Sequence, residues 1–322
     1  MLRTRLIATQ IADTSIRALK TWAGHRRTTN GATHWRLDTR ASVDYINRVY
    51  DDYVRYGAIT PGWLLGKSVL EIGFGDSLGV ALRFLAGGAA QVTSIDAFAP
   101  VQNTAQQTRI YQMLRDQCDA AGRARFDEAV QFAPQLHFAL HRLTALLNTS
   151  IEAAADRFLP CSFDLIVSRA VLMELPDPQP AFAAMDKLLR PGGKMIHSIA
   201  PLHDYGMFTS SAEHHPLEFL TISPAMYKMM AGISGKPNRK LASFYRNATD
   251  SLGYRSQAHI VRLTGSRTKF SPGVFDVQHD PGQYGHARAL VDAIRPRLAQ
   301  QFRSAAEEDL MIADLFLVAE KP

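Results

Sequence analysis

The stretch Ser68-Val69-Leu70-Glu71-Ile72-Gly73-Phe74-Gly75-Asp76-Ser77-Leu78-Gly79 sets the architecture expected for the rest of the chain. Residues 69–72 form a short apolar run broken by one acid, and two glycines follow. After Ser77, apolar residues recur at helical spacing. This order predicts a strand, a tight glycine turn and a helix. Because such a turn directs the free N–H groups of the new helix toward a ligand, we expect a nucleotide-type site here.

Length and composition indicate one enlarged globular domain. The chain has 322 residues, of which 46% are apolar, enough for a sizeable core. No apolar run approaches the roughly 18 residues of a membrane helix. The two cysteines, Cys118 and Cys161, have no metal-ligand spacing and suggest no disulfide framework. We therefore expect a reducing, cytoplasmic location.

Positive charge is concentrated near the N-terminus. Residues 1–40 contain eight basic and two acidic side chains, and this surplus equals the net charge of +6 of the whole chain. We expect a helical arm over residues 1–60, followed by the main domain over residues 61–322. We expect this arm to be either a solvated surface helix or a segment that makes a peripheral contact with an anionic surface, for example a membrane. Asp13 and Lys20 interrupt its apolar positions, which argues against a secretory signal.

A second strand is expected over residues 91–96. It ends at Asp96, 21 residues after Gly75. A carboxylate at the tip of this strand can accept hydrogen bonds from both hydroxyls of a ribose. The alternative is that Asp96 only caps the segment that follows.

Two long connections predict helical insertions, at about residues 100–145 and 205–250. In the first, residues 136–147 follow a helical pattern, which would place His137 and His141 on one face. That spacing suits a metal, but no third ligand follows in a recognisable pattern. We therefore expect no metal site.

Further strands are predicted toward the C-terminus. Residues 163–168 form a strongly apolar strand, and a tight turn at 190–193 precedes a strand over 194–199. Residues 254–263 and 310–320 are expected to form the last two strands.

Four of these blocks resemble class I S-adenosylmethionine-dependent methyltransferases, in the order that the family has them. The similar segments are Val69–Gly75, Ser94–Asp96, Phe163–Leu172 and Leu188–Lys194. The resemblance implies an α/β fold: a seven-stranded, Rossmann-like, doubly wound sheet with an antiparallel last strand, plus N-terminal helices and helical cap insertions. Residues 43–53, 78–83, 195–199 and 237–239 also look like a bacterial branch associated with surface-carbohydrate or secondary-metabolite pathways.

The resemblance assigns S-adenosylmethionine as the cofactor. By it, Gly73 and Gly75 pack against the methionine part of that molecule. Glu71 orients their loop, and Asp96 holds the ribose.

The resemblance also assigns the two ends of the cofactor. Ala97 would lie beside the adenine. Ile151 and Glu152 match the segment that follows the third strand in the family and that often holds the adenine. Ser168 and Arg169, at the end of the strand over residues 163–168 (the family's fourth), would lie under the methionine and the reacting methyl group.

Methyl transfer from a sulfonium is an in-line displacement, and a hydroxyl acceptor benefits from a general base. The best candidate for this base is His203, in the loop after the strand over residues 194–199 (the family's fifth), because an imidazole titrates near working pH. Asp204 would orient His203 or bind substrate hydroxyls. His197, inside the fifth strand, is either a second candidate or a core histidine.

The predicted function is methylation of a hydroxyl on a small molecule, a sugar or a glycan precursor, with nitrogen and carbon acceptors left open. One alternative is a non-catalytic module that binds S-adenosylmethionine. Another is an RNA or protein methyltransferase that uses the basic arm, although the fourth motif lacks the Asn/Asp-Pro-Pro-Tyr/Phe signature of amino-group nucleic-acid methylation. A nicotinamide-dependent dehydrogenase would share Gly73, Gly75 and Asp96 but would not explain the later blocks.

Overall fold

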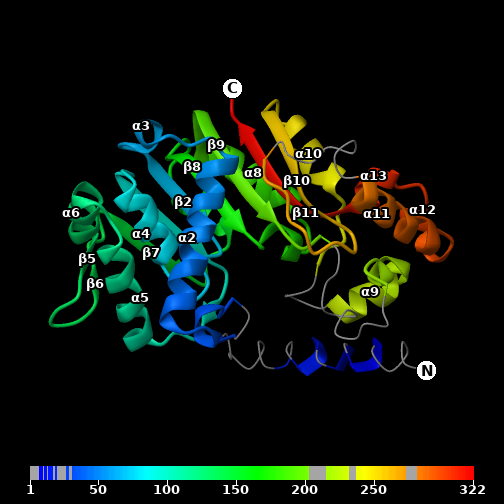
Figure 1. The fold of residues 1–322 in the computed structure, drawn as a ribbon, viewed down its shortest axis with the longest axis horizontal. Coiled ribbons are helices and arrows are strands. Elements are labelled where there is room, and N and C mark those ends of the chain that lie inside the picture. The colour runs from blue at the N-terminus through cyan, green and yellow to red at the C-terminus, as the bar shows by residue number, and fades with distance from the viewer. Residues whose placement is uncertain are drawn as a thin grey trace.

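A seven-stranded sheet runs through the molecule (Figure 1). The computed structural model describes residues 7–9, 11–12, 14–16, 19, 27–28, 31–202, 215–231, 237–272 and 281–322. The strand order is β10-β11-β9-β8-β2-β3-β7. The strands are β2 (Ser68–Ile72), β3 (Gln91–Asp96), β7 (Leu143–Leu147), β8 (Phe163–Arg169), β9 (Leu189–Ile199), β10 (Arg255–Leu263) and β11 (Ile312–Glu320).

The order and direction of the strands confirm the predicted fold class. β2 pairs in parallel with both β3 and β8, and β8 pairs in parallel with β9. β11 runs antiparallel between β9 and β10. The central strands are buried on both faces, since all five residues of β2 and the first six of β8 are buried. Double burial explains why these strands are near-continuous apolar runs in the sequence.

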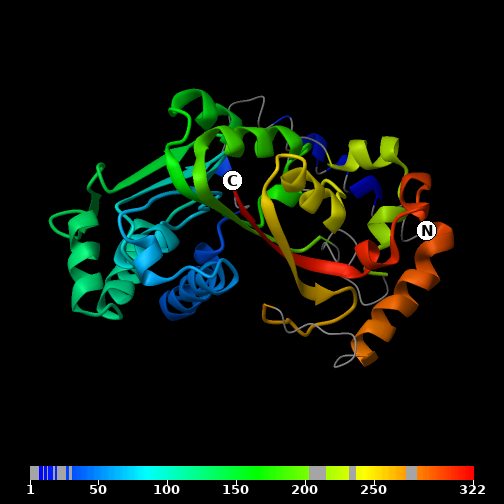
Figure 2. The same cartoon turned by 90° about the horizontal axis from the view of Figure 1, so that it is seen from above.

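Helices cover both faces of the sheet. On one face α2 (Thr39–Tyr56), α4 (Gly79–Ala86), α5 (Thr104–Asp116) and α6 (Ala120–Ala129) contribute to one apolar cluster. On the other, α7 (Ile151–Arg157), α8 (Gln179–Leu188) and α10 (Ala242–Asp250) contribute to a second. Figure 2 shows the blue-to-cyan helices and the green helices on opposite sides of the strands. The carboxyl ends of the parallel strands therefore meet along one edge between these layers.

Helix α2 is part of this packed domain. The Asp38 carboxylate accepts a hydrogen bond from the Ala41 amide and so caps the helix, as the sequence predicted. Val43, Ile46 and Tyr53 project from α2 into the same core as β2 and α4. The predicted boundary between the arm and the main domain, at residue 60, thus lies after α2, and α2 already packs in the core of the main domain.

The first insertion differs from the sequence prediction. After α5 and α6 comes a short hairpin of β5 (Val130–Gln131) and β6 (His137–Phe138), which leads into β7. The helix predicted over residues 136–147 is therefore wrong. β7 lies at the sheet edge and pairs along its whole length with β3, and this long-range pairing outweighs local helical preference. His137 lies in β6 and His141 in the following turn, so they share no helical face.

A third apolar cluster lies beyond the ends of β10 and β11. It joins α9 (Pro224–Ala231), α11 (Pro281–Ile294), α12 (Gln300–Arg303) and α13 (Glu307–Met311). In the second predicted insertion, the described residues form α9 and α10. None of the helices in the described ranges has the length and apolar content needed to span a bilayer.

Candidate functional site

The loop after β2 requires glycine at two positions. Gly73 and Gly75 have φ values of +79° and +63°, in the left-handed region that favours glycine. A Cβ atom at Gly73 would lie 2.3 Å from Val171 Cγ2, and one at Gly75 would lie 2.5 Å from the Gly31 carbonyl oxygen. The turn is therefore packed closely against Val171 and the Gly31 backbone, and only glycine fits at these two positions.

Glu71 lies buried beneath this loop. It faces Ser94 across the β2–β3 pair, and the Ser94 hydroxyl lies 2.8 Å from Glu71 Oε2. Burial raises the pKa of Glu71 to about 7, against the lowering effect of the Ser94 hydrogen bond. The side chain thus titrates near neutral pH and links β2 to β3 just before the loop.

Asp96 joins the tip of β3 to the glycine loop. The Gly75 amide donates to Asp96 Oδ2 at 3.0 Å, and the Phe98 amide donates to Oδ1 at 2.9 Å. Burial raises the pKa of Asp96, while these two bonds lower it. Each carboxylate oxygen keeps a further lone pair. Asp96 therefore caps the following segment and can still accept hydrogen bonds from a ligand.

The segment predicted for adenine also lies at this edge. The Thr149 amide donates to the Asp96 carbonyl at 2.9 Å, which brings the residues after β7 to the end of β3. Ala97 is exposed and Glu152 is half-buried in the first turn of α7, whereas Ile151 is buried in the core. The side chain of Ile151 therefore packs inward, leaving Ala97 and Glu152 at the surface of the edge.

Ser168 and Arg169 point to opposite faces of the sheet, as neighbouring strand residues do. Ser168 Oγ lies 2.8 Å from Nδ1 of His197 in β9. His197 has no exposed surface and contacts the Phe182 ring of α8 edge-on. Burial lowers the pKa of His197 to about 3. The imidazole is therefore neutral, and this environment favours the core-histidine interpretation over a general base.

Arg169 points instead toward α2. Its Nη1 lies 3.2 Å from Asp52 Oδ2, and its guanidinium carbon lies 5.7 Å from the Tyr45 ring centroid. Burial lowers the pKa of Arg169, but Tyr45, Tyr53 and Asp52 together outweigh it, so the net pKa is raised. Neither Tyr45 nor Asp52 was among the predicted site residues. Their spacing of seven residues places them on one face of the predicted helix, and this was the signal that could have identified them.

A segment before α2 covers the glycine loop. We call residues 31–37 the N-terminal strap. The Gly31 carbonyl accepts a hydrogen bond from the Asp76 amide, and the Asp76 carboxylate accepts from the amides of His34 (3.1 Å) and Trp35 (2.7 Å). Upstream, β1 (Arg27–Thr28) pairs in parallel with β4 (Ala99–Pro100), just after Asp96. This strap could not be predicted from local sequence patterns, because it depends on contacts between residues about 40 positions apart.

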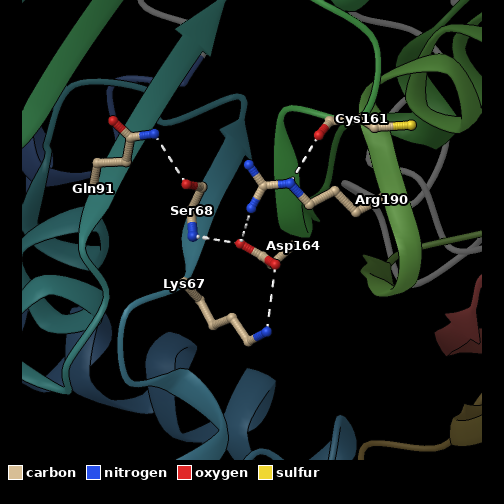
Figure 3. Close-up of polar contacts among 6 residues, drawn as sticks. All are labelled: Lys67, Ser68, Gln91, Cys161, Asp164 and Arg190. Atoms are coloured by element: carbon tan, nitrogen blue, oxygen red, sulfur yellow. Dashed lines mark hydrogen bonds and ion pairs between the residues drawn. The ribbon is translucent and has the colours of Figure 1, made fainter.

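A separate polar cluster lies at the opposite, amino end of the strands (Figure 3). Asp164 Oδ2 accepts hydrogen bonds from the Ser68 amide and from Arg190 Nη1, both at 2.9 Å, and Lys67 Nζ lies 3.4 Å from Oδ1. Arg190 Nε also donates to the Cys161 carbonyl. This cluster ties the start of β2 to the start of β8.

The remaining predicted residues, His203 and Asp204, lie outside the described residues. Within the described ranges, no group of three or more His, Cys, Asp or Glu side chains is arranged to hold a metal ion.

A family model described as a methyltransferase domain matches residues 47–235, more than half of the chain. The chain belongs to this family. The match spans the glycine loop, Asp96 and the ends of β8 and β9. S-adenosylmethionine is the cofactor of these class I methyltransferases.

Solved structures of low sequence identity align with this methyltransferase fold. Phosphoethanolamine N-methyltransferase 2 of Haemonchus contortus, in complex with S-adenosyl-L-methionine, is 14% identical; 86% of this chain and 52% of that chain are covered, with a TM-score of 0.43. The cyclase SpnF is 16% identical, with 97% and 94% covered and a TM-score of 0.42. An S-adenosylmethionine-dependent methyltransferase from Mesorhizobium loti is 16% identical, with 81% and 98% covered and a TM-score of 0.39.

The chain spans about half the length of the Haemonchus enzyme that it matches. A search of curated proteins gives no significant match.

The residues at the carboxyl edge fit S-adenosylmethionine. Gly73 and Gly75 form the left-handed turn between β2 and α4, and Asp96 keeps lone pairs available beside it. Glu71 is a buried acid next to this turn, and the cofactor carries a sulfonium and an ammonium group. Asp96 would hold the ribose, and the loop from Gly73 to Gly75 would contact the methionine part.

Proposed function

We propose that this methyltransferase transfers a methyl group from S-adenosylmethionine to a hydroxyl of a small molecule, a sugar or a glycan precursor. The observation that carries the proposal is the bond between the Gly75 amide and Asp96 at the tip of β3, within a chain of the methyltransferase family. It joins the acid and the glycine loop into one rigid unit of the kind that holds a nucleoside.

The bound cofactor supplies an already activated methyl group on sulfur. The task left to the chain is therefore to bind, to orient and to exclude water. Asp96 and the glycine loop fix one end of the site, and Ser168 with Arg169 define the end of β8. Holding a nucleophile roughly 3–3.5 Å from the carbon that it attacks supplies much of the rate in such a displacement.

We assign the general base to His203, with Asp204 as its orienting or substrate-binding partner. Support for this pair comes from its place in the sequence, shortly after β9 ends at Ile199, since ligands bind beyond the carboxyl ends of the strands in this kind of sheet. A positioned base contributes about 10²–10⁴-fold to hydroxyl methylation. His197, buried against Ser168, acts as a positioning residue.

A methyl-transfer screen tests the proposal. The protein is incubated with methyl-labelled S-adenosylmethionine and with fractions of bacterial metabolites and polysaccharides, and the labelled product is analysed by NMR. We expect an O-methyl product and its loss in the Asp96→Ala variant. An N- or C-methyl product would contradict the hydroxyl acceptor. Cofactor binding without transfer to any fraction would favour the non-catalytic binding module.

The basic arm supports a second, weaker association. Since the whole surplus of +6 lies in residues 1–40, we propose that the protein is cytoplasmic and makes a peripheral contact with an anionic surface. Sedimentation with phosphatidylglycerol vesicles tests the contact. Binding should fall as salt rises, and equal binding to neutral phosphatidylcholine vesicles would overturn it.

A further inference from the structure

A hollow of about 500 Å³ lies outside the glycine loop, where the strap meets the beginnings of α2 and α5. Its wall is formed by Trp35, Asp38, Thr39, Asn103, Gln106 and Arg109. The volume is within the range of small-molecule sites. None of these residues has a role in the proposed cofactor site, so the hollow has no assigned occupant.

Trp35 lines this hollow and is one of the exposed large hydrophobic residues of the described chain. Its side chain is 50% exposed, although its amide is fixed by Asp76 at 2.7 Å. An indole held by its backbone while its ring stays in solvent offers a large, flat, electron-rich face at low entropic cost. Such a face suits a ligand that has a flat apolar surface with polarised C–H groups.

Three polar side chains around the indole are held in place by hydrogen bonds to the backbone. Asp38 Oδ1 accepts from the Ala41 amide, and Asn103 Oδ1 accepts from the Gln106 amide. Gln106 Nε2 donates to the carbonyls of His34 (2.8 Å) and Leu37 (2.7 Å). Because these bonds fix the side chains before any ligand arrives, binding would lose little conformational freedom.

Each of these fixed groups keeps a second polar atom available. In the described part of the chain, no hydrogen bond engages Asp38 Oδ2, Gln106 Oε1 or Asn103 Nδ2, and no carboxylate pairs with the Arg109 guanidinium. The hollow therefore offers both acceptors and donors next to the indole. A ligand with several hydroxyl groups, each both donor and acceptor, matches this set.

We infer that this hollow is a saccharide-binding subsite in which a pyranose ring stacks on Trp35 and its hydroxyls bond to Asp38, Asn103 and Arg109. One part of this inference rests on the proposed function, namely that the bound saccharide belongs to the methyl acceptor or to its glycan. Asp76 connects this hollow to the proposed cofactor site. Its carboxylate accepts a hydrogen bond from the Trp35 amide, and Asp76 directly follows Gly75 in the sequence. A sugar bound here lies beside the cofactor loop.

The test is an NMR titration of the full chain, in the absence of cofactor. The chain has three tryptophans, so the indole N–H signals are few and can be assigned with single Trp→Phe variants. The probes are methyl β-D-glucopyranoside, methyl α-D-mannopyranoside and methyl α-L-rhamnopyranoside, with their trisaccharides. We expect at least one probe to shift the Trp35 signal saturably while the Trp63 signal stays in place.

Variants separate binding from folding. By isothermal titration calorimetry, which does not need the Trp35 signal, Trp35→Ala should lower the affinity roughly tenfold, as expected for the loss of a ring contact, and Trp35→Phe should restore most of it. Arg109→Ala should weaken binding too, whereas Arg246→Ala, an exposed arginine on α10, should have no effect. Urea midpoints check that each variant folds.

Saturable shifts that spread equally over Trp35 and Trp63, or no shift with any probe, would overturn the subsite. Either result would leave the proposed function standing, because methyl transfer is measured separately. Failure of methyl transfer with intact sugar binding would overturn the proposed function instead.

Discussion

The two ends of β2 bury carboxylates in opposite electrostatic settings. At the amino end, Asp164 is paired with Arg190 and Lys67 and also accepts the Ser68 amide. At the carboxyl end, Glu71 is equally buried, but its hydrogen-bond partner is the Ser94 hydroxyl. Within the described residues no cation lies in ion-pair contact with Glu71. Among the described residues, the start of β2 thus contacts a neutralised acid of the neighbouring strand, Asp164 of β8, whereas the end of β2 itself carries an acid without a cationic partner, Glu71.

From this difference we infer that the carboxyl end is the one that binds a ligand. Burying an ionised carboxylate costs several kcal/mol unless opposite charge is supplied. Arg190 and Lys67 supply it at the amino end, where the result is a link between two strands. At the carboxyl end the acid instead has its pKa raised to about 7, so the site can respond to a cationic ligand.

The largest expected effect is on cofactor affinity. Asp96→Ala should weaken binding of S-adenosylmethionine roughly a thousandfold, because two hydrogen bonds to a charged group are worth about 3–6 kcal/mol. Isothermal titration calorimetry measures it. Asp116→Ala, with its exposed carboxylate, is the control. Unchanged affinity in Asp96→Ala would remove this residue from the ribose.

The second prediction concerns pH. The pKa of Glu71 in the folded state is about 7, above its ordinary value of 4.5, so the folded state binds more protons than the unfolded state between these values. Glu71 should therefore lower the free energy of unfolding by up to about 3 kcal/mol as pH rises through this window, whereas buried His197, whose pKa is lowered to about 3, should raise it as pH rises toward 6.5. Urea unfolding at pH 5 and pH 8 measures the change.

Glu71→Gln should remove the Glu71 contribution alone, so the change in stability from pH 5 to pH 8 should be less unfavourable in this variant than in the parent chain, whereas Glu152→Gln should behave like the parent chain. If the Glu71→Gln variant lost as much stability between the two pH values as the parent chain, Glu71 would not be the titrating group.

The third prediction tests the contact between strap and loop. Gly75→Ala should lower the free energy of unfolding by about 2–3 kcal/mol, because it forces a side chain into a left-handed conformation against the Gly31 carbonyl. Cofactor affinity should fall with it. Gly62→Ala is a matched control, since a Cβ there meets nothing within 4 Å. Equal unfolding midpoints for the two variants would contradict the described packing.

The smallest effect is expected at the amino end. Asp164→Ala leaves the Ser68 amide without its acceptor but frees two partly exposed cations to hydration, so the cost should be about 1–2 kcal/mol of unfolding free energy. Affinity for S-adenosylmethionine should stay the same. A tenfold loss of affinity would mean that the two ends are not independent.

Local sequence signals were sufficient for the central strands. The apolar runs of β2, β3 and β8 are doubly buried, and the glycines after β2 occupy left-handed conformations that only they adopt easily. These features depend on a few neighbouring residues, so they could be predicted. The identity of Asp96 as the acid beside the loop follows from the same strand order.

Features set by distant contacts could not be predicted in this way. Residues 143–147 form a strand because β3 pairs with them, while their own pattern suggested a helix. Asp76 binds the strap through residues 41 and 42 positions away, and no local pattern indicates this. His197 is an intermediate case, since its place inside a strand left two interpretations that only its burial separates.

The central claim is that the carboxyl end of β2 binds the methyl donor while the amino end only holds the strands together. Two amides report on it directly: Gly75 donates to Asp96 at one end, and Ser68 donates to Asp164 at the other. In an NMR titration with S-adenosylmethionine, the Gly75 amide signal should shift saturably and the Ser68 signal should remain fixed. A shift of Ser68 without one of Gly75 would contradict the account.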